Sequence, residues 1–294
     1  MAFSRPATRF HRLELPNAFS VVLKTTVFVL ILFSSTNITV FPKYLRYFMP
    51  TAQAASVNDI RSLAEIFYSR NDYAAAFPLF MQAAELGDED SMNYLGIMHL
   101  DGLGAPTSNA LAMSWFVKAG ELGHADAQNN AGFMFNYGIG VHLNFTEAIN
   151  WFMLAAGQDH PLAAYHLGRL YLNGQGVDED VEEAKFWFAK AKSAGVYLLL
   201  STDAKKGLPY SQFFLGDLYA DGLVIPRDFS MALKWYLSAA ELGNELAQFR
   251  LAECFFRDRS VPIDKEQAQE WLRHAARRGH PSAQILLHNL NEGW

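Results

Sequence analysis

The sequence has 294 residues, of which 51% are apolar, so it can form one large folded domain or two of ordinary size. Its formal net charge of −6 is unevenly distributed: residues 1–54 carry six basic residues and one acidic residue, which leaves −11 for residues 55–294. The negative charge of residues 55–294 repels the phosphate backbone of nucleic acids, which argues against nucleic-acid binding. The single cysteine, Cys254, excludes a fold held together by intramolecular disulfides.

Residues 1–54 have the features of a signal peptide or a signal anchor. Basic residues precede the apolar run Val27–Phe33, and Ala52-Gln53-Ala54 follows as a candidate cleavage site. This pattern predicts export, to the periplasm or another extracytoplasmic space, or tethering to a membrane through residues 20–41. Translation starting at Met49 would instead give a cytoplasmic protein.

Three kinds of residue recur with one irregular spacing in the rest of the chain. The spacings are 36, 36, 48 and 36 residues, and the longer one is a single period plus a 12-residue insertion. The three sets are Trp115, Trp151, Trp187, Trp235 and Trp271; Gly96, Gly132, Gly168, Gly216 and Ala252; and Ala112, Ala148, Ala184, Ala232 and Ala268. They predict five units, at residues 91–126, 127–162, 163–210, 211–246 and 247–282.

Each unit is predicted to contain two helices, its first and its second helix. In the third unit, the first helix covers residues 163–172 and ends at Gly174, and Asp180 is the expected N-cap of the second helix. Trp187 and Phe188 share the apolar face of that second helix, and Trp187 is predicted to fill the space where the two helices open apart. The insertion, residues 196–207, is predicted to continue or restart the second helix, with its apolar residues covered.

These residues resemble the Sel-one-like repeat, a relative of the tetratricopeptide repeat. The pattern that carries the resemblance is Leu167-Gly168, Tyr171, Gly174, Gly176-Val177, Asp180, Ala184, Trp187 and Gly195. The resemblance implies an all-α fold, a right-handed α/α superhelical solenoid whose first helices line the concave side. It also implies a tetratricopeptide-like helix pair at residues 57–90 and a C-terminal capping helix at residues 283–294.

No motif indicates an enzyme, and we predict no catalytic residues, no cofactor and no metal site. Cys254 aligns with apolar positions of the other first helices and is expected on a buried face. His124, His160 and His280 follow second helices, and His124 and His160 are predicted to be turn residues. By resemblance to a family of adaptors, we expect a scaffold whose concave groove binds a peptide or protein partner. The alternatives are a tethered regulatory subunit of a membrane or envelope complex and, with least support, a hydrolytic enzyme.

Two positions of the first helix, three residues apart, vary most between units. Residues at this spacing share one helix face, so together they form a stripe that is either a partner-binding surface or a solvated face without a partner. The predicted partner-binding stripe consists of Tyr94, Ile97, Asn130, Phe133, His166, Arg169, Phe214, Asp217, Arg250 and Glu253.

Overall fold

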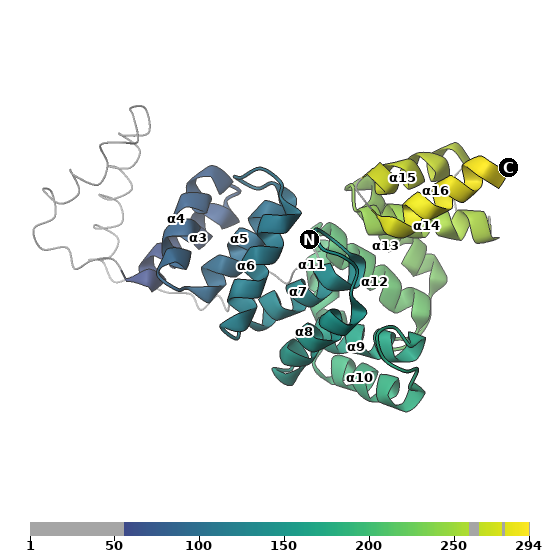
Figure 1. The fold of residues 1–294 in the computed structure, drawn as a ribbon, viewed down its shortest axis with the longest axis horizontal. Coiled ribbons are helices and arrows are strands. Elements are labelled where there is room, and N and C mark those ends of the chain that lie inside the picture. Colours follow the sequence, from purple (N-terminus) through teal and green to yellow (C-terminus); the bar gives the residue numbers. More distant parts are fainter. Residues whose placement is uncertain (1–55, 259–264, 278–279, 294) are drawn as a thin grey trace, which may run out of the picture. The chain divides into compact units, whose positions relative to one another are not determined.

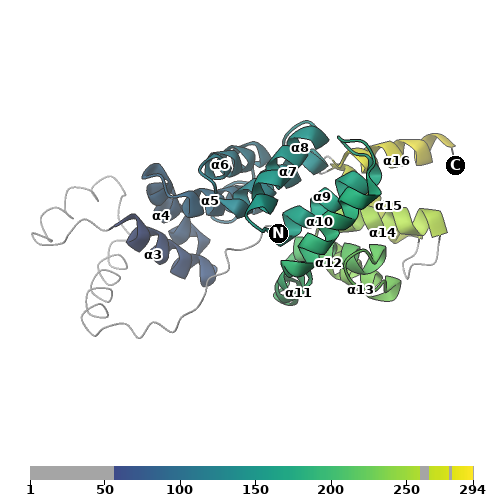
Figure 2. The same ribbon diagram turned by 90° about the horizontal axis from the view of Figure 1, so that it is seen from below.

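The computed structural model describes residues 56–258, 265–277 and 280–293, and every regular element in these ranges is an α-helix. Residues 1–54, with the predicted tether at 20–41, lie outside the described residues. The helices follow one another as consecutive pairs (Figures 1 and 2). They are α3 (Val57–Ser69), α4 (Tyr73–Glu85), α5 (Glu89–Asp101), α6 (Asn109–Glu121), α7 (Ala125–Tyr137), α8 (Phe145–Gly157), α9 (Pro161–Asn173), α10 (Val181–Ser193), α11 (Val196–Lys205), α12 (Pro209–Asp221), α13 (Phe229–Glu241), α14 (Glu245–Asp258), α15 (Lys265–Arg277) and α16 (Pro281–Gly293).

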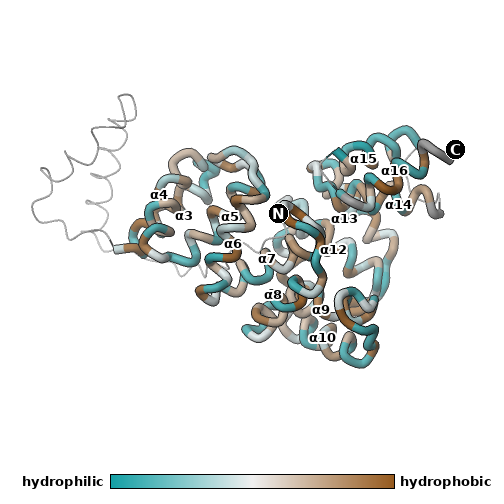
Figure 3. Tube along the Cα trace, viewed as in Figure 1, coloured by the Kyte–Doolittle hydropathy of each residue, from teal (hydrophilic) through white to brown (hydrophobic). Residues whose placement is uncertain are grey.

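Each helix packs mainly against the helices next to it in the sequence, which is the arrangement of an α-helical solenoid. Hydrophobic and hydrophilic residues alternate along the helices (Figure 3), because each helix buries one face against its neighbours. The first helices of the five units are α5, α7, α9, α12 and α14, and the second helices are α6, α8, α10, α13 and α15. The predicted all-helical solenoid is confirmed.

Glycines and short polar side chains define the helix ends. Gly174 takes the left-handed conformation, with φ of 60°, directly after α9. The side chain of Asp180 accepts hydrogen bonds from the backbone N–H groups of Glu182 and Glu183, both at 3.0 Å, and caps α10. The predicted roles of Gly174 and Asp180 are confirmed.

The two helices of a unit approach each other where the first helix carries glycine. A Cβ atom on Gly168 would lie 2.6 Å from Cε1 of Phe188, so no side chain fits there. The same relation holds between Gly96 and Phe116, Gly132 and Phe152, and Gly216 and Tyr236. Trp187 is buried as predicted, but the ring that covers Gly168 belongs to Phe188, the residue after the tryptophan.

The 12-residue insertion forms a separate helix, α11, which takes over a packing role from α10. Gln212 of α12 donates a hydrogen bond to the carbonyl of Ala204 near the end of α11, at 3.2 Å. Gln128 and Gln248 make the same bond to Gly120 and Ala240, near the ends of the second helices α6 and α13. In this part of the chain α11 therefore lies on α12 in the place that a second helix occupies elsewhere.

The predicted helix in the insertion is confirmed, since α11 restarts after Gly195. Val196, Leu200 and Ala204 are buried, whereas the side chain of Leu198 is 70% exposed. The expectation that the apolar residues of the insertion are covered is therefore wrong for Leu198 and for Tyr197, which is 42% exposed. On a helix only one face can pack against α12, and Leu198 lies on the other.

His124 and His160 join successive units. Nδ1 of each accepts a hydrogen bond from a backbone N–H three residues later, at 3.1 and 3.2 Å, and thereby caps the next first helix. Nε2 of His124 lies 3.0 Å from Asp90, and Nε2 of His160 lies 3.1 Å from Asp126. The histidines predicted as turn residues are thus N-caps that also reach a carboxylate of the preceding unit.

Of the helices in the described ranges, none is long and apolar enough to cross a membrane.

Candidate functional site

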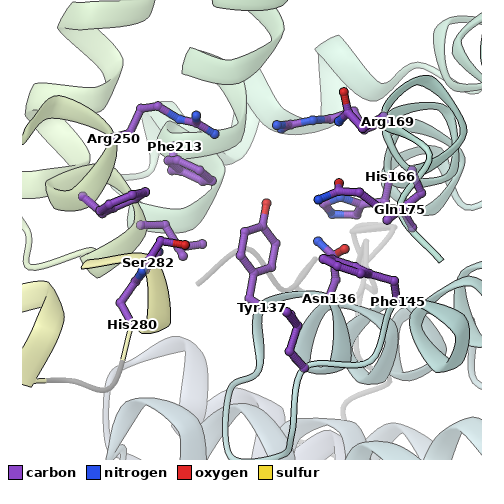
Figure 4. Close-up of a pocket in the computed structure, with 15 residues that line it drawn as sticks. Asn136, Tyr137, Phe145, His166, Arg169, Gln175, Phe213, Arg250, His280 and Ser282 are labelled. Atoms are coloured by element: carbon purple, nitrogen blue, oxygen red, sulfur yellow. The ribbon is translucent and has the colours of Figure 1, made fainter. Parts of the chain in front are cut away.

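Two adjoining pockets open beside the first helices α7, α9, α12 and α14, and they share Arg169, Asn173 and Arg250. The larger pocket has a volume of about 320 Å³ and the smaller one about 300 Å³. The larger pocket (Figure 4) is lined by Asn136, Tyr137, Leu143, Phe145, His166, Arg169, Leu170, Asn173, Gln175, Phe213, Leu246, Phe249, Arg250, His280 and Ser282. The smaller pocket is lined by Arg169, Leu172, Asn173, Asp217, Ala220, Asp221, Leu223, Phe229, Tyr236, Arg250, Glu253 and Cys254.

Asp217 lies between the two arginines that both pockets share. Its carboxylate accepts a hydrogen bond from Nη1 of Arg169 and lies 3.8 Å from Nε of Arg250. The hydroxyl of Tyr236 donates to the same carboxylate at 2.6 Å, and Nη1 of Arg250 donates to Glu253 at 3.2 Å. The side chain of Asp217 is only 4% exposed, whereas those of Arg169 and Arg250 are 25% and 32% exposed. The carboxylate therefore anchors two guanidinium groups that reach the pockets.

The surroundings of Asp217 keep it charged. Burial raises the pKa of a carboxyl group, but Arg169, Arg250 and the hydrogen bond from Tyr236 outweigh this effect and lower the pKa of Asp217 below its usual value. Burial and the neighbouring carboxylate hold the pKa of Tyr236 well above its usual value, so its hydroxyl keeps its proton and remains a donor. Asp217 thus acts as a fixed negative charge that orients both arginines.

Tyr165 and Asp221 hold Arg169 from another side. The hydroxyl of Tyr165 donates to Asp221 at 2.6 Å, and the guanidinium of Arg169 lies 5.8 Å from the centroid of the Tyr165 ring. Burial raises the pKa of Asp221, an effect that the hydrogen bond from Tyr165 and the charge of Arg169 oppose. In Figure 4, Arg169 and Arg250 point toward each other from opposite walls, and the Tyr137 hydroxyl is directed at the gap between them.

His166 lies in the ring cluster behind the larger pocket. Its ring stacks on Phe152 with 4.7 Å between centroids and meets Phe214 edge-on at 5.0 Å. Burial, together with the nearby positive charge of Arg169, lowers the pKa of His166 to about 3. Within the described residues its Nε2 atom is buried without a hydrogen-bond partner. His166 is therefore neutral at physiological pH.

The predicted stripe does not form one exposed surface. Arg169, Arg250 and Glu253 are half-buried and line the pockets. The other stripe residues are buried: Tyr94, Ile97, Asn130, Phe133, His166, Phe214 and Asp217. For these, the expected exposure is wrong, because successive first helices approach closely enough for their side chains to pack together. His166 of α9 and Phe214 of α12, for instance, lie 5.0 Å apart as ring centroids.

The repeat pattern can also be compared with known families. The profile of the Sel1 repeat matches residues 89–124, 125–160, 161–196, 209–244 and 246–280, which together make up more than half of the chain. The chain belongs to the Sel1 repeat family. The predicted resemblance is thus confirmed, and α11 falls between the third and fourth matched Sel1 repeats. The Sel1 repeat is a helical scaffold fold that generally serves protein interaction.

Several solved structures are similar to this chain. One is a protective antigen with an SLR fold, present in uropathogenic Escherichia coli strains, with 28% sequence identity and a TM-score of 0.47 over 82% of this chain and 58% of the antigen. Another is a Sel1 repeat protein from Oxalobacter formigenes, with 28% identity and a TM-score of 0.45 over 74% of this chain and 96% of the other. An immunity protein from Pseudomonas aeruginosa matches at 17% identity and a TM-score of 0.36 over 74% and 83%. This chain spans less than two thirds of the antigen's length, and no curated protein matches it.

The stripe prediction missed the accessible residues at the ends of the first helices of the Sel1 repeats. Tyr137, Asn173 and Asp221 come one helical turn after the second stripe position, and all three line the pockets. They lie on the same helix face as the stripe and differ between units, as the stripe residues do. Extending the stripe by four residues would have found them. The repeat spacing does not show over what part of their length successive first helices stay in contact.

Cys254 is half-buried and lines the smaller pocket, whereas the aligned Met98, Met134, Leu170 and Leu218 are buried. Its predicted place on a buried face is therefore only partly correct. In the described ranges of the chain, no group of three or more His, Cys, Asp or Glu side chains is arranged to hold a metal ion.

Proposed function

We propose that this Sel1 repeat protein is a non-catalytic scaffold that binds a segment of a partner protein across the two pockets. The observation that carries the proposal is that the pockets adjoin and share Arg169, Asn173 and Arg250. Their walls come from first helices of four units, so a bound segment would contact several units at once. Extended surfaces built from several units are what repeat proteins use for binding.

The chemistry of the larger pocket suits a polypeptide segment. Tyr137 and Phe249 offer rings, and aromatic residues and arginine most often carry binding energy at protein interfaces. The side chains of Asn136 and Asn173 each present a donor and an acceptor, as a peptide group does. Because the buried network already orients Arg169 and Arg250, binding loses less conformational entropy than it would with free side chains.

Site-specific photo-crosslinking in the native cells tests this proposal. A photoreactive phenylalanine derivative would replace Tyr137 in the larger pocket and, as a matched aromatic control, Phe186 on the second helix α10, whose side chain is 56% exposed. We expect a discrete partner adduct from position 137 and none from position 186. Adducts of equal yield from both positions, or none from position 137, would contradict the proposal.

We further propose that the scaffold acts outside the cytoplasm, either free after cleavage or as a tethered regulatory subunit of a membrane or envelope complex. The proposal rests on the charge and apolar pattern of residues 1–54. Fractionation followed by N-terminal sequencing separates the cases. A soluble exported chain that begins at Ala55 would indicate cleavage, and an intact N-terminus in the membrane fraction would indicate a tether. A cytoplasmic chain that begins at Met49 would overturn the proposal.

A further inference from the structure

The two pockets share their arginines but differ in their other charges. Among the described residues that line the larger pocket there is no aspartate or glutamate, while Arg169 and Arg250 are both present. The smaller pocket contains Asp217, Asp221 and Glu253 beside the same two arginines. The guanidinium groups therefore stand at a boundary between a basic side and an acidic side.

Both arginines, which line the two pockets, keep unused hydrogen-bonding capacity. A guanidinium carries five N–H donors. Arg169 uses Nη1 for Asp217, and Arg250 uses Nη1 for Glu253 and directs Nε at Asp217. In the described part of the chain, Nη2 of each arginine has no hydrogen-bond partner. Both groups are held in place by buried Asp217, so their remaining donors are oriented in advance.

A carboxylate is the group that suits these donors. Arginine binds carboxylates through two parallel hydrogen bonds, and charge-assisted bonds of this kind are roughly twice as strong as neutral ones. The rings of Phe213 and Phe249 beside Arg250 limit access of water, which strengthens such a contact. A basic group, in contrast, would be repelled by Arg169 and Arg250 in the larger pocket.

We propose that the larger pocket binds the side-chain carboxylate of an aspartate or glutamate within an extended partner segment. This inference rests on the proposed scaffold function. An internal acidic residue fits better than a chain terminus because the pockets adjoin through Arg169, Asn173 and Arg250, which lets the segment continue from one pocket into the other.

Selection from a display library of short random peptides against the protein tests both the scaffold function and the binding of a carboxylate. The best peptide is then synthesised with both ends blocked, together with a copy in which its acidic residue is replaced by the neutral amide. For the wild-type protein we expect the neutral copy to bind at least about tenfold more weakly, which corresponds to about 1.4 kcal/mol. The difference should shrink as salt is raised, because charged contacts are screened.

The variant Arg250→Gln should discriminate less than the wild type between the acidic and the neutral peptide, because one of the two positive charges that distinguish them is gone. Lys185→Gln is the matched control: it removes a positive charge from the second helix α10, where Lys185 pairs with Glu182 away from the pockets, and should leave the preference intact. Circular dichroism would establish that Arg250→Gln is folded. If it is not, the acidic-to-neutral comparison on the wild-type protein and its salt dependence still decide the question.

The two proposals fail in different ways. If the selection enriches no peptide, the proposed scaffold function fails. If it enriches peptides without acidic residues, or peptides that bind only through a free C-terminal carboxylate, the pocket assignment is wrong while the scaffold function stands. Equal loss of preference in Arg250→Gln and Lys185→Gln would also overturn the assignment.

Discussion

The two variable positions of the first helix, which make up the predicted stripe, lie in a closed junction between first helices at one place in this protein and in an open junction at another. Between α5 and α7 they hold Tyr94, Ile97 and Asn130, which are buried, and Asn130 donates a hydrogen bond to Asn93 at 3.0 Å. Between α9, α12 and α14 they hold, besides buried His166 and Phe214, two arginines and two acidic residues, and two pockets open beside these. Equivalent positions in a repeat therefore need not have equivalent surroundings.

The difference follows from side-chain size and charge. Asn93 and Asn130 are short and uncharged, and they fit in a closed interior with one neutral hydrogen bond between them. Arg169 and Arg250 are long and carry more donors than Asp217 can accept, so their guanidinium groups must keep access to solvent or to a ligand. The insertion helix α11 lies at this open junction, between α10 and α12.

The largest expected effect tests whether the open junction is nevertheless tightly packed beneath its pockets. Phe214→Ala removes a fully buried ring that contacts His166 and Phe133, and should lower the free energy of unfolding by about 3–5 kcal/mol. Urea unfolding measures it. Phe186→Ala on the exposed face of α10 should change stability by less than about 0.5 kcal/mol. A loss below about 1 kcal/mol for Phe214→Ala would mean that this junction is loosely packed.

A smaller effect distinguishes the charged junction from the neutral one. Asp217→Asn removes the charge that both arginines share and should destabilise the protein by about 2–3 kcal/mol. The exposed pair of Glu182 and Lys185 provides the comparison, because Glu182→Gln should cost about 1 kcal/mol or less. Thermal unfolding would show which of the two variants loses more stability. An equal loss of stability in both would contradict a structural role for Asp217.

The pH dependence of stability should report on His166. Its pKa falls from 6.5 to about 3 on folding, so the unfolded chain binds more protons between these values and stability declines as pH drops below 6.5. From neutral pH to about pH 5 the loss attributable to this residue is about 2 kcal/mol. His166→Phe keeps a ring against Phe152 and should flatten the profile in this range. Parallel profiles for the variant and the wild type would show that His166 does not contribute.

The smallest effect concerns the exposed face of α11. Leu198→Gln should change the free energy of unfolding by less than about 0.5 kcal/mol, since the side chain of Leu198 has little packing to lose. Leu200→Ala on the buried face of the same helix should cost about 2–5 kcal/mol. Denaturant midpoints would compare the two variants. Similar losses in both would mean that Leu198 is covered in solution.

Much of the fold could be read from spacing alone. The tryptophan register located the units, Gly174 and Asp180 marked helix ends by their conformational and capping preferences, and the 12-residue insertion was recognisable as an extra helix. These features depend on local chemistry, which residues carry wherever the chain places them. The candidate site was predicted less well: Arg169 and Arg250 belong to it, but Tyr94, Phe133 and Phe214 are core residues.

The sequence by itself determined the helices, their order and the family, because helix formation and repeat stacking are set by neighbours along the chain. Only the tertiary structure decided which variable positions are buried and which reach a pocket. Arg169 and Asp217 are 48 residues apart, and Tyr165 and Asp221 are 56 residues apart. Whether such residues meet depends on how closely successive first helices approach, and that distance is set by packing between units rather than by any one unit's sequence.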